Sequence, residues 1–152
     1  MKSSRKKPLE GDVFILQPQD NLFMYGKVIK VNVSSKDPFV NGGNLVYIYK
    51  KQSADKIMPD VLSPNDLLFP PMVTNHQGWL KGYFEMIGNN GITEDELDVN
   101  FGFWHKTSEK FYNLHGEVLQ DEPLQWTGSG LVSYGGIGRA IHRIFRGESH
   151  LL

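Results

Sequence analysis

The chain has 152 residues, of which 39% are hydrophobic, 12% aromatic and 22% charged, a composition typical of one folded globular domain. It contains no cysteine, which excludes disulfide scaffolds, thiolate zinc sites and cysteine nucleophiles. The formal net charge is −1, so no overall field draws the protein to nucleic acid or to an anionic membrane.

The N-terminal segment is polar and basic. We expect residues 1–9 to form a flexible basic tail, residues 10–147 to form a single β-rich domain, and residues 148–152 to form a short tail. No apolar stretch of signal-peptide length follows the basic residues, and no run approaches the roughly 20 apolar residues of a membrane span. These features predict a cytoplasmic protein without a membrane partner.

A β-hairpin is predicted at the start of the domain. Residues 13–16 form a short apolar run, residues 18–21 have the composition of a turn, and residues 22–33 are rich in β-branched side chains. Residues 45–49 are apolar throughout, which is typical of an inner strand.

The middle of the chain is less regular. Ser63 and Pro64 predict a single helical turn, with the serine as its cap. Two consecutive prolines place any strand within residues 67–73 at a sheet edge. Bulky apolar side chains in residues 78–88 predict a further strand.

The last third predicts a hairpin and a helix. Two aromatic runs, residues 101–104 and 111–114, flank a polar five-residue loop. From about residue 134 to 145, apolar residues recur at helical spacing, while Arg139, Arg143 and Arg146 lie off that stripe and predict a solvated outer face. The expected fold is α+β and mostly β: a strongly bent antiparallel sheet or a small SH3-like barrel, with one C-terminal helix.

No catalytic, metal or cofactor site is predicted. The five histidines lack metal-ligand spacing, although His105 and His115 could face each other across the second hairpin. Ser129 lies between two glycines, but the rest of the nucleophile-elbow pattern is missing, so a flexible loop is expected there.

Acidic residues are concentrated in one part of the chain. Residues 91–122 contain eight acidic side chains against only Lys106 and Lys110. We expect these carboxylates to be solvated and exposed, because they lie in predicted turns among polar neighbours. Together they could present a negative surface to a basic partner.

The most distinctive segments are short motifs. Gly11 and Asp12 precede the first apolar strand, and Tyr25 and Gly26 lie in the second. Further along, Trp79 is followed by a Met-Ile-Gly sequence that ends at Gly88. Over about residues 9–120 these motifs resemble the immunity protein 26 family of bacterial polymorphic toxin systems. Lys27 stands where the resemblance leads us to expect arginine.

The resemblance implies a cytoplasmic antitoxin that neutralises its cognate toxin by stoichiometric binding, with no chemistry of its own. A nuclease is the expected toxin, since an acidic surface would be steered to a basic cleft. The motif residues are expected to be structural, with Asp12 bonding a nearby backbone N–H. The predicted partner-binding residues are Glu94, Asp95, Glu96, Asp98, Trp104, His105 and Tyr112.

Two other functions stay open at this point. A nucleic-acid-binding module with an SH3-like barrel would use the N-terminal cations and the arginine face, but the near-zero net charge argues against it. A small hydrolase would use paired carboxylates or His105 and His115, for which the sequence shows no catalytic spacing.

Overall fold

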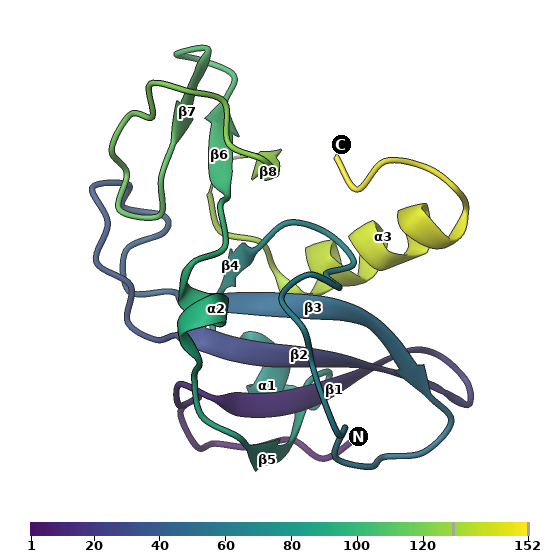
Figure 1. Cartoon of the computed structure of the whole chain (residues 1–152). Helices are drawn as coiled ribbons and strands as arrows, with labels where there is room; N and C mark the ends of the chain where they lie inside the picture. Colours follow the sequence, from purple (N-terminus) through teal and green to yellow (C-terminus); the bar gives the residue numbers. More distant parts are fainter. Residues whose placement is uncertain (129, 152) are drawn as a thin grey trace.

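Two β-sheets and a C-terminal helix make up the computed structural model, which describes residues 1–128 and 130–151 (Figure 1). The larger sheet is antiparallel with strand order β4-β3-β2-β1-β5, and the smaller sheet has the order β7-β6-β8. The strands are β1 (Asp12–Gln19), β2 (Leu22–Lys30), β3 (Asn44–Ser53), β4 (Met72–Thr74), β5 (Glu85–Asn89), β6 (Gly102–His105), β7 (Lys110–Tyr112) and β8 (Trp126–Gly128). The helices are α1 (Gln77–Leu80), α2 (Glu94–Leu97) and α3 (Tyr134–Phe145).

The predicted mostly-β fold with one C-terminal helix is confirmed. Of the two sheet forms expected, the open bent sheet is the one observed, because β4 and β5 are its edges and do not pair with each other within the described residues. Both predicted hairpins form, and β4 lies at an edge as its prolines indicate. The small sheet departs from the antiparallel expectation, since β8 pairs with β6 in parallel.

The larger sheet is buried on both faces, which explains its long apolar runs. On one face, Phe14 and Val28 pack in a cluster with Ile137 and Ile141 of α3. On the other face, side chains of β1, β2 and β3 pack with Phe103 of β6 and with residues of the connecting loops. The central strand β2 is therefore buried along most of its length, with Phe103 of β6 in the core cluster of one face and α3 in the core cluster of the other.

Two sequence predictions are wrong in detail. Only the second half of residues 78–88 is a strand, because Trp79 lies in α1 and packs edge-on against Phe14 and Phe84 in the core. The carbonyl of Trp79 accepts a hydrogen bond from Ser4 N (2.9 Å), so the N-terminal segment passes beside α1. Ser63 begins a non-helical turn, in which its hydroxyl accepts from a backbone N–H two residues on.

Two glycines and one aspartate of the first hairpin are required by steric constraints and by hydrogen bonding. Gly26 pairs with Phe14 across the hairpin, and a Cβ at Gly26 would lie 2.3 Å from the Phe14 ring. Gly11 has φ +89°, a conformation that favours glycine. The Asp12 carboxylate accepts from Leu9 N (2.8 Å) and from Asn89 Nδ2 (3.0 Å), which ties the start of β1 to the edge strand β5.

The helix α3 has 12 residues, and no helix in the described part of the chain has the length and hydropathy of a bilayer span.

We predict that Gly26→Ala lowers the free energy of unfolding by about 1–3 kcal/mol, because the added methyl group overlaps the buried Phe14 ring. Urea denaturation measures the change. Gly138→Ala is the matched control: this glycine lies inside α3 with nothing within 4 Å of the new Cβ, so the substitution is expected to stabilise by up to about 1 kcal/mol. Equal effects of the two substitutions would contradict the steric argument.

Candidate functional site

The acidic segment is built around the short helix α2. Thr93 is its N-cap and forms a reciprocal capping box, with the Thr93 hydroxyl accepting from Glu96 N (3.3 Å) and Thr93 N donating to Glu96 Oε1 (3.0 Å). Glu94, Asp95 and Glu96 lie in the first turn, where the helix dipole favours negative charge. The local sequence therefore forms this turn in spite of its density of carboxylates.

Glu96 is not on the surface, which corrects the expectation that the whole acidic segment is solvated. Its carboxylate forms an ion pair with Lys27 of β2, at 2.8 Å from Nζ to Oε2 and 2.9 Å from Nζ to Oε1, and both side chains are only 3% exposed. The sequence pattern did not predict this ion pair, because its two members are 69 residues apart in the chain.

Two tyrosines of β3 surround the ion pair. The Tyr47 hydroxyl donates to the backbone carbonyl of Glu96. Burial, and secondarily the Glu96 carboxylate, raise the pKa of both Tyr47 and Tyr49 above the usual range. The helix α2 is thus attached to the centre of the larger sheet through both the side chain and the main chain of Glu96.

The buried glutamate leaves its neighbours facing solvent. Glu94, Asp95 and Asp98 are exposed, and Leu97 between them is 53% exposed. Leu97 is not among the residues predicted from the sequence to bind a partner, although its position as an apolar residue among acidic ones was a signal for it.

A second acidic stretch lies in the loop before β8. Asn100 Oδ1 accepts from Leu124 N (2.8 Å), which joins the segment after α2 to the loop that contains Asp121 and Glu122. Both of these carboxylates are exposed, and Leu124 is 87% exposed. We call this combined surface, residues 94–98 and 121–124 without Glu96, the acidic surface.

The predicted aromatic contact residues form a separate group on the small sheet. Trp104 packs against Phe111 and Trp126, with ring centroids 4.8 and 6.3 Å away. His105 lies over Tyr112 at 4.1 Å between centroids. Trp104, His105 and Tyr112 are half-buried, so each exposes part of its ring.

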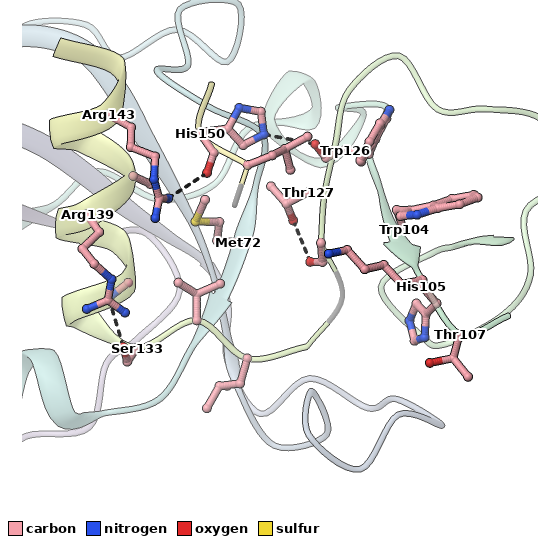
Figure 2. Close-up of a pocket in the computed structure, with 17 residues that line it drawn as sticks. Met72, Trp104, His105, Thr107, Trp126, Thr127, Ser133, Arg139, Arg143 and His150 are labelled. Atoms are coloured by element: carbon pink, nitrogen blue, oxygen red, sulfur yellow. Dashed lines mark hydrogen bonds between the residues drawn. The ribbon is translucent and has the colours of Figure 1, made fainter. Parts of the chain in front are cut away.

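A cleft of about 690 Å³ separates the small sheet from α3 (Figure 2). Arg139 and Arg143 line it from α3, which corrects the expectation that the arginine face of this helix is purely an outer surface. Arg139 is nevertheless exposed, Arg143 is half-buried, and Arg146 fits the expectation as an exposed residue paired with Glu148 outside the cleft lining. The opposite wall contains Trp104, Trp126, His105 and Lys106.

The chain after α3 turns back toward β8 and forms one end of the cleft. Arg143 donates to the backbone carbonyl of His150 (3.4 Å), and His150 Nε2 donates to the carbonyl of Trp126 (3.2 Å) (Figure 2). These two contacts join α3 to the small sheet.

The histidines do not meet. His115 Nδ1 donates to Ser34 O (2.7 Å), while His105 stacks on Tyr112. Within the described residues, no group of three His, Asp or Glu side chains has the arrangement of a metal site. Ser129 lies outside the described residues.

Comparison with known families identifies the family of this chain. A family model described as Immunity protein 26 matches residues 9–114, more than half of the chain. The chain belongs to the Immunity protein 26 family. No curated protein and no solved structure matches it at a significant level.

The Immunity protein 26 match spans the larger sheet, α2 and the β6–β7 hairpin, and it ends before β8 and α3. It contains the motif residues on which the resemblance was based. In the structure Trp79 is buried in the core, Tyr25 donates to Ile57 O (2.7 Å), and Gly88 leaves room for Met58, whose Sδ would lie 2.8 Å from an added Cβ. The cleft therefore combines residues of the matched β6–β7 region with residues of β8 and α3, which lie outside the match.

We predict that Lys27→Met lowers the free energy of unfolding by about 3–5 kcal/mol, because it leaves the Glu96 carboxylate buried without a counter-charge. In the double variant Lys27→Met/Glu96→Gln part of this loss is recovered, since glutamine is neutral and can retain the capping contact. The control is Lys56→Met, which removes an exposed pair with Glu85 and is expected to cost at most about 1 kcal/mol. Equal losses in the two single variants would contradict a stabilising role for the buried pair.

We predict that stability falls as the pH rises above about 10, the ordinary pKa of tyrosine. The pKa values of Tyr47 and Tyr49 are raised in the folded state, so the unfolded chain loses these protons at a lower pH. Deprotonation therefore stabilises the unfolded state relative to the folded state as the pH rises. Urea denaturation between pH 8 and 11 measures the slope, and Tyr47→Phe is expected to flatten it. An unchanged slope in this variant would contradict the assignment.

Proposed function

We propose that this member of the Immunity protein 26 family is an antitoxin that acts in the cytoplasm. It neutralises a cognate toxin by stoichiometric binding and carries out no reaction itself. The observation on which the proposal depends is the acidic helix α2, which the buried Lys27–Glu96 ion pair attaches to β2 of the larger sheet. A surface fixed in this way loses little conformational entropy when a partner binds.

The acidic surface has the composition of an interface. Leu97 and Leu124 provide exposed apolar contacts, and carboxylates lie around them. Apolar anchors surrounded by polar groups are typical of protein–protein interfaces, in which a few residues supply most of the binding energy. We include the half-buried aromatic residues Trp104, His105 and Tyr112 of the small sheet in the proposed partner-binding set.

A nuclease is the proposed class of toxin. Enzymes that cleave nucleic acid need a basic cleft for the phosphates, and an acidic surface is steered to such a cleft and excludes its substrate. The carboxylates of the acidic surface would repel nucleic acid, so direct nucleic-acid binding is not supported at this surface. The cations that such a function needs gather in the cleft instead.

We predict that the charge reversal Glu94→Lys/Asp95→Lys/Asp98→Lys abolishes protection when the protein is co-expressed with the product of the adjacent toxin gene. The substituted side chains are exposed, so the fold is retained while attraction becomes repulsion. A fall in affinity of at least a hundredfold is expected by calorimetry with the catalytically inactive toxin.

The matched control is Asp20→Lys/Asp55→Lys/Asp60→Lys, which changes the net charge equally at exposed aspartates that are not part of the acidic surface. This variant is expected to protect cells and to form a 1:1 complex. Full protection by the α2 variant, or equal loss in both variants, would overturn the proposed surface. A toxin without nuclease activity on DNA or RNA would overturn the proposed toxin class.

A further inference from the structure

We propose that the cleft between α3 and the small sheet binds a nucleotide, a ligand that combines phosphate with an aromatic base. This site shares Trp104 and His105 with the proposed partner-binding set, and its Trp126 donates through Nε1 to Glu122 of the acidic surface (3.2 Å), but the proposal does not depend on the antitoxin role. Its volume of about 690 Å³ lies within the range of small-molecule sites in proteins.

One wall of the cleft is cationic. Arg139 and Arg143 lie one helical turn apart on α3 and both point toward the cavity (Figure 2). Within the described part of the chain, neither guanidinium lies within ion-pair distance of a carboxylate. Like charges at this spacing destabilise a helix, and a bound anion would remove that cost. Guanidinium groups match the geometry of phosphate oxygens through paired hydrogen bonds.

The charge of the lining is one-sided. Lys106 adds a third cation to the two arginines, and no aspartate or glutamate is among the described lining residues. This contrasts with the chain as a whole, in which 17 acidic residues slightly exceed 16 Lys and Arg. The cleft is therefore selective for negative charge, while the acidic surface lies on other elements.

The facing wall is aromatic. Trp104 and Trp126 line the cleft across from the arginines, with His105 beside them (Figure 2). Indole rings stack on nucleobases and contribute about 1–3 kcal/mol per base. A cationic wall opposite an aromatic wall matches the two ends of a nucleotide, whereas inorganic phosphate would leave the aromatic wall without a partner. The hydroxyls of Thr107 and Ser133 lie at the cleft as further hydrogen-bonding groups.

The test is calorimetric titration of the full chain with AMP, ATP, inorganic phosphate and a single-stranded oligonucleotide at moderate salt. Binding of AMP or ATP is expected, and the Arg139→Ala/Arg143→Ala variant is expected to bind at least tenfold more weakly. The matched control is Arg146→Ala, on the same helix but outside the cleft lining, which should bind like the original chain. Two of the three tryptophans line the cleft, so quenching of their fluorescence gives a second readout.

Binding of mononucleotides identifies a free nucleotide as the ligand, and binding of the oligonucleotide alone identifies a single strand. The proposal is overturned if neither binds, if the double arginine variant binds as tightly as the original chain, or if inorganic phosphate binds as tightly as AMP. Circular dichroism of the double variant verifies that α3 is intact. A further variant, Trp126→Leu, removes part of the aromatic wall and leaves the arginines unchanged. It is expected to weaken the binding of AMP but not the binding of phosphate.

Discussion

The buried ion pair between Lys27 and Glu96 determines where the functional part of this protein lies. Lys27 is in the central strand of the larger sheet, where a charged group without a partner would be strongly unfavourable. Glu96 supplies the counter-charge and also completes the cap of α2. One carboxylate thus attaches the helix to the sheet, and the exposed carboxylates beside it take their positions from that attachment.

The larger sheet serves as a platform for two different surfaces. Because both of its faces are covered, it carries α3 on one face and the connection into the small sheet on the other. The small sheet and α3 both extend beyond β3 and β4 (Figure 1), and residues of both line the cleft. The contact of His150 with Trp126 joins them at one end.

The near-zero net charge conceals a separation of charge. Apart from Glu96, the carboxylates of α2 and of the loop at residues 121–124 are exposed, whereas Arg139 and Arg143 of α3 line the cleft. Opposite charges that neutralise each other in the total thus lie on different elements. Each surface can attract a ligand of opposite sign, and the two proposals for this protein follow from that separation.

The sequence by itself determined the elements whose signals are local. Turn residues and aromatic runs predicted both hairpins, apolar spacing predicted α3, and the Gly-Asp and Tyr-Gly motifs indicated the family. Tertiary structure alone decided that Glu96 is buried, that Leu124 joins the acidic surface and that Arg139 faces a cleft. These outcomes depend on contacts between residues far apart in the chain, and the polarity of a residue does not show which distant side chain will lie against it.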